Sequence, residues 1–124
     1  MKRLTKREEE LMNILWENGA MFVKEVIQLL PDPKPHYNTI STIIRGLEEK
    51  GFIDHEQFGN TYRYFAKITK DDYGKGTMKD FISKYFNRSY SSVVSMFVEE
   101  EEISTDEIKK LIEKVESSST NQND

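Results

Sequence analysis

Apolar residues in the first fifty positions recur at the spacing of amphipathic helices. The first stripe follows Thr5 and Glu8, which are spaced as a capping box, and consists of Leu11, Met12, Ile14, Leu15 and Trp16. A second stripe within residues 22–30 consists of Val23, Val26, Ile27 and Leu30. Prolines at positions 31, 33 and 35 exclude helix from the next segment. A third helix is predicted over residues 36–50, ended by Gly51.

The pattern then changes from helical spacing to two short strands, predicted at residues 52–57 and 61–66. The tripeptide Phe58-Gly59-Asn60 between them is typical of a hairpin turn. Three helices followed by a two-stranded hairpin is the order of a winged helix-turn-helix. We therefore predict a mainly α fold with a small β-hairpin, in which residues 1–70 form a winged helix DNA-binding domain.

The rest of the chain is predicted as a helical arm at residues 71–116 and a disordered polar tail at residues 117–124. Short amphipathic helices bury little surface alone, so a second copy of the chain is the expected cover for their apolar faces. Packing against the winged domain in a monomer is the alternative. The residues predicted to form the dimer interface are Phe81, Ile82, Tyr85, Phe86, Val93, Val94, Phe97, Ile108, Leu111, Ile112 and Val115.

The third helix carries the clearest functional signal. At about 100° per residue, one face holds Ile40, Ile43, Ile44 and Leu47, and the opposite face is polar. Short hydrogen-bonding side chains and one arginine suit close approach to base edges and phosphates in a major groove. The residues predicted to bind DNA are Asn38, Thr39, Ser41, Thr42 and Arg45 from this helix, Asn60, Tyr62 and Arg63 from the wing at residues 58–63, and Lys24.

Composition narrows the class of protein further. The 124 residues contain no cysteine, which excludes disulfides, thiolate zinc sites and a cysteine nucleophile. The net charge of -4 divides unevenly, because residues 1–70 hold 11 Lys and Arg against 10 Asp and Glu, whereas residues 71–124 hold 7 against 12. The acidity therefore belongs to the arm, and it does not argue against nucleic acid as a partner of the winged domain.

Catalytic and metal-binding patterns are not recognisable in the sequence. His36 and His55 have no carboxylate or thiolate beside them at ligand spacing, and no nucleophile–base or paired-carboxylate constellation is visible. We expect no enzyme activity, no cofactor and no metal. Apolar stretches fall short of the roughly 20 residues that span a bilayer, and no export signal follows the charged start. A cytoplasmic protein without membrane insertion is expected.

Several short motifs resemble one family. They are Leu11-Met12-x-x-Leu15-Trp16, Thr39-Ile40-x-Thr42-x-x-x-x-Leu47-x-x-Lys50-Gly51, Tyr62-x-Tyr64 and Phe97-Val98-Glu99-x-x-x-Ile103-Ser104-x-x-Glu107-Ile108-x-x-Leu111. Over about residues 4–116 the chain resembles the BlaI/MecI-type penicillinase repressors. The resemblance implies a homodimeric transcriptional repressor of antibiotic-resistance genes that reads a palindromic operator with residues 36–50 and the wing.

The resemblance also implies a route of induction, in which a membrane sensor with a protease domain triggers cleavage of the C-terminal arm. The cut in the family falls between an Asn and a Phe; here Phe97 matches the second residue and Met96 replaces the first. Two other readings stay open at this point. One is a regulator that binds a small molecule between its aromatic C-terminal helices, and the other is a winged-helix module that binds protein instead of DNA.

Overall fold

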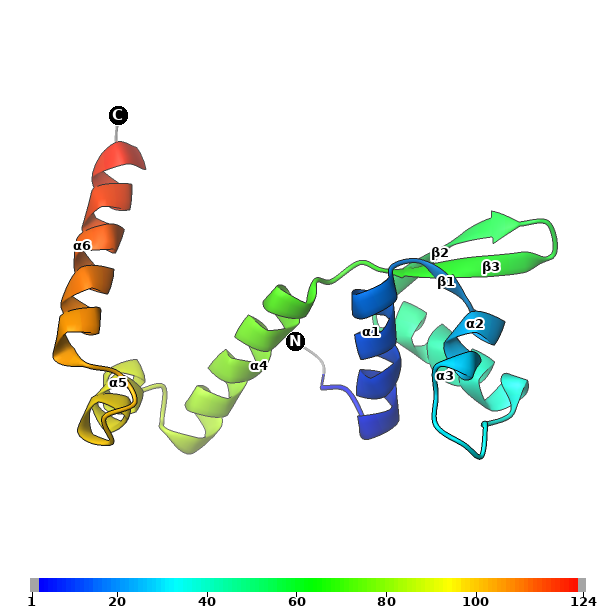
Figure 1. Ribbon diagram of the computed structural model, residues 1–124, viewed down its shortest axis with the longest axis horizontal. Helices are drawn as coiled ribbons and strands as arrows, with labels where there is room; N and C mark the ends of the chain where they lie inside the picture. Colours follow the sequence, from blue (N-terminus) through cyan, green and yellow to red (C-terminus); the bar gives the residue numbers. More distant parts are fainter. Residues whose placement is uncertain (1–2, 123–124) are drawn as a thin grey trace. The chain divides into compact units, whose positions relative to one another are not determined.

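The computed structural model describes residues 3–122, with side chains described through residue 118. The chain divides into two compact units, with the boundary between residues 77 and 78. The elements of the first unit are α1 (Lys6–Asn18), β1 (Met21–Phe22), α2 (Val23–Gln28), α3 (Tyr37–Glu49), β2 (Ile53–Phe58) and β3 (Thr61–Ala66) (Figure 1). The strands form an antiparallel sheet in the order β1-β3-β2. This arrangement is the winged helix-turn-helix that the sequence predicts.

Helix α1 begins and ends where local sequence signals place its ends. The Thr5 side chain accepts a hydrogen bond from Glu8 N–H, and the Glu8 carboxylate accepts one from Thr5 N–H at 2.9 Å, so the predicted capping box is present. At the other end, Gly19 has a φ of 82° and its N–H donates to the Leu15 carbonyl. A positive φ of this size favours glycine, because a side chain there would strain the backbone.

Strand β1 differs from the prediction, because the sheet has three strands and the sequence indicated two. Met21 and Phe22 pair with Tyr64 and Arg63 of β3, whereas the pattern assigned residue 22 to the start of the second helix. A strand of two residues is too short to show the alternation by which strands are recognised. Its pairing also depends on a segment about forty residues further along the chain, which local spacing cannot reveal.

The hairpin has the register that its turn requires. Phe58 pairs with Thr61, and the two residues between them form the turn, in which Gly59 has a φ of 60°. Glycine at the first central position is typical of two-residue hairpin turns. Along the same ladder His55 lies opposite Tyr64 and Glu56 lies opposite Arg63. Because successive side chains alternate between faces, these two pairs lie on opposite faces of the sheet.

The core of the first unit gathers the predicted helical stripes against the sheet. Its fully buried large side chains are Leu11, Met12, Val26, Ile40, Ile44, Leu47, Phe52 and Ile53. The single tryptophan, Trp16, lies at the edge of this core, where its Nε1–H donates to the Ile68 carbonyl at 2.8 Å. The ring of Tyr73 packs beside Trp16 and Phe52, at centroid distances of 5.7 and 5.8 Å. The segment after β3 is thereby fixed to the winged unit.

The remaining helices are α4 (Lys70–Tyr85), which begins in the first unit, and α5 (Tyr90–Glu99) and α6 (Thr105–Gln122) of the second. Helix α6 includes residues 117–122, which differs from the disordered tail expected there, while residues 123–124 lie outside the described residues. Its N-terminus is capped by Ser104, whose Oγ accepts from Glu107 N–H at 3.1 Å. Once a capped helix has formed, each added residue extends it at low cost, which accounts for helix beyond the apolar stripe.

Candidate nucleic-acid interface

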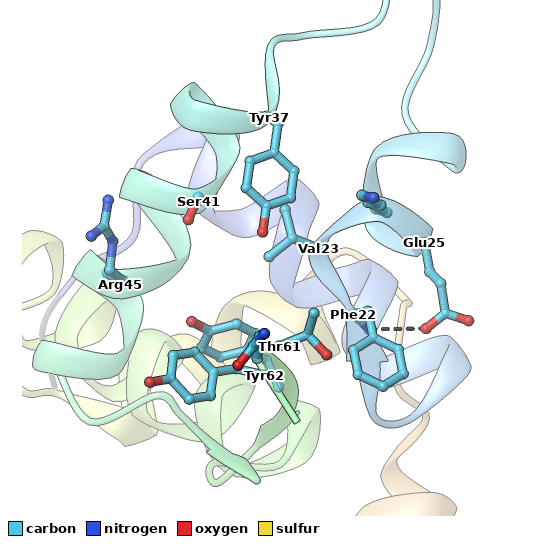
Figure 2. A pocket seen from close by; sticks show the side chains of 11 residues that line it. Phe22, Val23, Glu25, Tyr37, Ser41, Arg45, Thr61 and Tyr62 are labelled. Carbon is cyan, nitrogen blue, oxygen red and sulfur yellow. Dashed lines mark hydrogen bonds between the residues drawn. The ribbon is translucent and has the colours of Figure 1, made fainter. Parts of the chain in front are cut away.

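Helix α3 presents a continuous polar row on the side away from the core. Asn38, Thr39, Thr42 and Arg45 are exposed and Ser41 is half-buried, whereas Ile40, Ile44 and Leu47 are fully buried. Ile43 is half-buried and packs against the core, so the predicted division of this helix into two faces is confirmed. Figure 2 shows Ser41 and Arg45 on successive turns of α3, beside an open groove.

The polar row is ordered by contacts within the helix. Thr42 Oγ1 donates to the Asn38 carbonyl at 2.8 Å, and Arg45 Nη2 lies 3.5 Å from Thr42 Oγ1. The first bond fixes the threonine rotamer and leaves its oxygen lone pairs free to accept. The second contact is long, so the Arg45 guanidinium keeps most of its five donors for other partners.

The groove lies between α3, the start of α2 and the wing, and has a volume of about 460 Å³. Figure 2 shows Tyr37 pointing from the start of α3 toward Val23, with Thr61 and Tyr62 across the groove. The lining residues are Phe22, Val23, Lys24, Glu25, Tyr37, Ser41, Arg45, Asn60, Thr61, Tyr62 and Tyr64. The fold thus brings together five predicted DNA-binding residues, which are Lys24, Ser41, Arg45, Asn60 and Tyr62.

Six groove residues were not among the predicted site residues, and Tyr37 and Thr61 are the two of them that carry exposed hydroxyl groups. Tyr37 is 48% exposed at the first position of α3, and Thr61 is exposed at the first position of β3. Position at the start of a recognition helix was the available signal for Tyr37, because the first turn of such a helix approaches base edges. The signal for Thr61 was its place beside the hairpin turn.

Arg63 lies outside the groove although the sequence predicted it as a DNA contact. Its Nη2 forms an ion pair with Glu56 Oε2 at 3.0 Å, and its guanidinium carbon lies 4.7 Å from the centroid of the Phe58 ring. Strand alternation places Arg63 on the face opposite Tyr62 and Tyr64. The structure therefore gives this arginine partners within the wing.

Tyr64 forms the floor of the groove and is 4% exposed, while Tyr62 beside it is 43% exposed. Burial raises the pKa of the Tyr64 hydroxyl, and the negative charge of Glu48 raises it further, against the opposing effect of Arg45. Tyr64 is thus a packing residue with a neutral hydroxyl. Tyr62 is the member of the pair that remains accessible.

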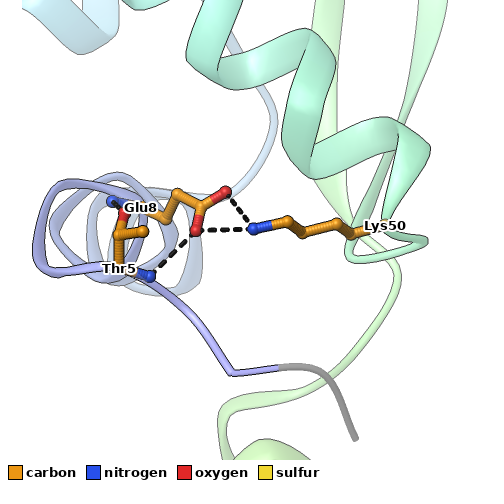
Figure 3. Close-up of polar contacts among 3 residues, drawn as sticks. All are labelled: Thr5, Glu8 and Lys50. Atoms are coloured by element: carbon orange, nitrogen blue, oxygen red, sulfur yellow. Dashed lines mark hydrogen bonds and ion pairs between the residues drawn. The ribbon is translucent and has the colours of Figure 1, made fainter.

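A partly buried ion pair holds the C-terminal end of α3 against α1 (Figure 3). Lys50 Nζ lies 2.8 and 2.7 Å from the two carboxylate oxygens of Glu8, whose side chain is 9% exposed. Burial acts to raise the pKa of the Glu8 carboxyl. The hydrogen bonds from Lys50 and Thr5 and the charge of Lys50 outweigh that effect, so the pKa lies below its ordinary value. Glu8 is therefore an ionised structural group.

His55 has carboxylates beside it, contrary to what sequence spacing indicated. Its Nδ1 lies 2.9 and 2.7 Å from the Glu48 carboxylate oxygens and 3.9 Å from Asp54 Oδ1. The sequence interpretation was wrong here, because Glu48 lies in the last turn of α3 and His55 lies in the following strand, and only the turn between them brings the groups together. His36 is the N-cap residue of α3, where its side chain makes no capping hydrogen bond.

The residues predicted for the dimer interface divide into three groups by their exposure within one chain. Ile82 and Val93 are 6% and 9% exposed, so they are already buried within one chain. Phe86, Phe97 and Ile108 are half-buried. The members that remain exposed are Phe81, Tyr85, Val94, Leu111, Ile112 and Val115.

Among residues 3–122, none of the helices is both long and apolar enough to cross a membrane.

The order of elements, the three-stranded sheet and the exposed third helix define a winged helix-turn-helix protein. Its fold resembles the solution structure of the DNA-binding domain of the repressor BlaI, with a TM-score of 0.50 and 28% identity over 59% of this chain and 94% of that domain. The family model described as penicillinase repressor matches residues 4–117, and the chain belongs to this family.

Two relatives extend the similarity beyond the winged unit. The chain is 36% identical over 111 residues to the methicillin resistance regulatory protein MecI of Staphylococcus aureus (strain N315), covering 87% of this chain and 89% of MecI. It is 28% identical over 119 residues to the penicillinase repressor of Bacillus licheniformis, covering 92% of this chain and 90% of the relative. Both alignments are long enough to include helical segments that follow the winged unit.

Proposed function

We propose that this chain is a cytoplasmic transcriptional repressor that binds operator DNA with α3 in the major groove and the wing against the backbone. The observation that carries the proposal is the uncovered polar row of α3 beside a groove that also contains Lys24, Asn60 and Tyr62. A winged helix uses such a surface to place one helix against base edges. The relatives named as a resistance regulator, a penicillinase repressor and a repressor DNA-binding domain support the same function.

The contacts within α3 support different roles for its side chains. Arg45 is weakly held, so it is the proposed bidentate donor to a guanine, and Thr42 and Ser41 are proposed to contact neighbouring base edges. Asn38 and Thr39, at the first turn, are proposed to contact base edges or phosphate. Lys24, Asn60 and Tyr62 are the proposed phosphate contacts from the rim of the groove. Arg63 would have to leave Glu56 to join them, so its proposed share is small.

Operator affinity tests this assignment. The operator duplex is obtained by binding-site selection with the full chain, and affinities are measured by gel shift at fixed salt. Arg45→Ala should weaken binding by about 1–3 kcal/mol, which is a factor of about 5 to 150. Arg7→Ala is the matched control, because it also removes an exposed arginine of the winged unit, one that pairs with Glu10 on α1. Equal affinities for the two variants would refute the role of the α3 face.

We further propose that the repressor acts as a homodimer through its arm and reads a palindromic operator. Support comes from the exposed apolar side chains of the second unit, of which Leu111, Ile112 and Val115 repeat along α6 at helical spacing and are 51–64% exposed. Two winged units would then contact half-sites whose centres are about 34 Å or a multiple apart.

The oligomeric state tests this part of the proposal. Sedimentation equilibrium of the full chain should give twice the mass of one chain, 14.6 kDa. Leu111→Lys should shift the mass toward one chain, because a charge would replace a buried apolar contact. Lys110→Glu, a charge change at the adjacent exposed position, is the control and should remain a dimer. A monomeric unaltered chain at micromolar concentration would refute the dimer.

We also propose that cleavage of the arm by a sensor-controlled protease relieves repression, as the family resemblance implies. The expected bond joins Met96 and Phe97, both half-buried within α5. A protease binds its substrate extended, so α5 must first open locally, and cleavage would then separate the two half-site contacts. Intact-mass analysis of repressor from cells exposed to a β-lactam should show a fragment ending at Met96. Uncleaved repressor in derepressed cells would refute this route.

A further inference from the structure

Three potential metal ligands lie close together at the junction between the end of α3 and the start of β2. They are Glu48 in the last turn of α3 and the neighbouring pair Asp54 and His55 of β2, and one ligand atom from each lies within 4.8 Å of the others. The side chains are 30%, 51% and 32% exposed, so an ion has access to them from solvent. The DNA contacts proposed above use none of these residues.

The fold creates this arrangement by a tight reversal of the chain. Gly51 has a φ of 85° immediately after α3, and Phe52 N–H donates to the Leu47 carbonyl, so β2 starts back beside the last helical turn. Asp54 Oδ1 accepts from His55 N–H at 2.8 Å, which orients the carboxylate toward the histidine. Two of the three ligands are therefore ordered by local backbone geometry.

The imidazole is held in place by its neighbours in the sheet. His55 lies opposite Tyr64 in the ladder, and its ring centroid is 4.4 Å from that of Tyr62 and 5.7 Å from that of Tyr64. Contact with these two rings limits rotation of the imidazole, whose Nδ1 faces the Glu48 carboxylate. A ligand that is ordered before the ion arrives loses little conformational entropy on binding.

The distances suit a small divalent ion. Zinc binds histidine nitrogen and carboxylate oxygen at about 2.0–2.2 Å, so tetrahedral ligand atoms lie about 3.3 Å apart. His55 Nδ1 is 2.7 Å from Glu48 Oε2 and 3.9 Å from Asp54 Oδ1, so the first pair must move apart and the second together by about 0.6 Å each to reach that separation. An ion would take the place of the proton on Nδ1, and two carboxylates would balance its charge. Three protein ligands leave a fourth position for water.

We propose that Glu48, Asp54 and His55 form a binding site for a divalent transition metal of the zinc type. The imidazole distinguishes this class from magnesium and calcium, which prefer ligand sets made of oxygen alone. A bound ion would connect the last turn of α3 to β2, the strand that pairs with β3.

Zinc affinity of the full chain tests the proposal. Chelator-treated protein is titrated with Zn²⁺ in competition with a chromophoric zinc indicator, and the folded state of every variant is checked by far-UV circular dichroism. The chain should bind one zinc, and His55→Gln should weaken binding at least tenfold. His36→Gln is the matched control, because the chain has two histidines and His36 lies outside the cluster. Its affinity should equal that of the unaltered chain.

A second variant keeps the test decisive if His55→Gln fails to fold. Asp54→Asn retains an oxygen that can accept from His55 N–H while removing the ligand charge, so it should fold normally and still weaken zinc binding at least tenfold. Unchanged affinity in either folded variant would overturn the proposal. Absence of one-to-one zinc binding, or Mg²⁺ binding as tight as Zn²⁺ binding, would overturn it as well.

Discussion

The ion pair between Glu8 and Lys50 allows a quantitative prediction about what holds α3 in place. Replacing Lys50 with methionine keeps most of the side-chain length but removes the ammonium group that donates two hydrogen bonds to the Glu8 carboxylate, at 2.8 and 2.7 Å. The carboxylate is 9% exposed and would keep only the hydrogen bond from Thr5 N–H at 2.9 Å. The variant therefore leaves a buried charge without its counterion.

The size of the effect follows from the burial of the two groups. Removing one partner of a fully buried ion pair costs about 3–5 kcal/mol, and an exposed pair contributes about 0–1 kcal/mol. Lys50 is 30% exposed and its partner is nearly buried, so the pair lies between these limits. We expect Lys50→Met to lower the free energy of unfolding by about 2–3 kcal/mol. In a cycle with Glu8→Gln, the coupling energy should be about 1–2 kcal/mol.

The chain contains a natural probe for this measurement. Trp16 is its single tryptophan, and it packs in the winged unit with its indole bonded to the Ile68 carbonyl. Urea unfolding followed by tryptophan fluorescence therefore reports on the first unit within the full chain. With a denaturant slope of about 2 kcal/mol per molar, the midpoint should fall by about 1 M or slightly more.

A second ion pair, which lies on α1 as Glu8 does, provides the control. Arg7 Nη1 lies 3.2 Å from Glu10 Oε2, and these side chains are 43% and 41% exposed. Because water screens this pair, Arg7→Met should change the free energy of unfolding by less than about 0.5 kcal/mol. Equal shifts in Lys50→Met and Arg7→Met, or a coupling energy near zero between positions 8 and 50, would refute the reasoning.

Three further predictions concern the same unit. Because the pKa of Glu8 is lowered in the folded chain, its ionised carboxylate contributes fully to stability above the ordinary pKa of 4.5, and this contribution is lost as the pH falls through the lower, folded-state pKa. Below pH 4.5 the free energy of unfolding in urea should therefore fall faster for the unaltered chain than for Glu8→Gln. Parallel curves for the two proteins would contradict this. Gly51→Ala should lower the free energy of unfolding in urea by about 1–2 kcal/mol, because a residue with a side chain is strained at a φ of 85°. The added Cβ would meet no other atom, so backbone strain is the whole of the expected cost. An unchanged free energy would show that the backbone relaxes. Arg63→Ala should lower the free energy of unfolding by less than about 1 kcal/mol, because its ion pair with Glu56 is exposed. In salt titrations it should weaken the binding of all DNA duplexes about equally, whatever their sequence. A loss of affinity confined to the operator sequence would instead assign Arg63 to a base contact.

Features that depend on neighbouring residues were predictable from the sequence. The capping box of Thr5 and Glu8, the turn glycines and the two faces of α3 all arise from contacts within a few positions. Helical and strand periodicity report which side of an element is buried, and the order of elements then indicated the winged fold. The polar row of α3 was found in this way.

Tertiary structure alone decided which of these surfaces meet. The pairing of β1 with β3, the groove that brings Lys24 near Asn60, and the contact of Glu8 with Lys50 across 42 positions join segments that spacing does not relate. The turn after α3 brought His55 to Glu48 against the sequence interpretation. Periodicity orients a side chain toward a core or toward solvent, but its partner depends on how separate elements pack.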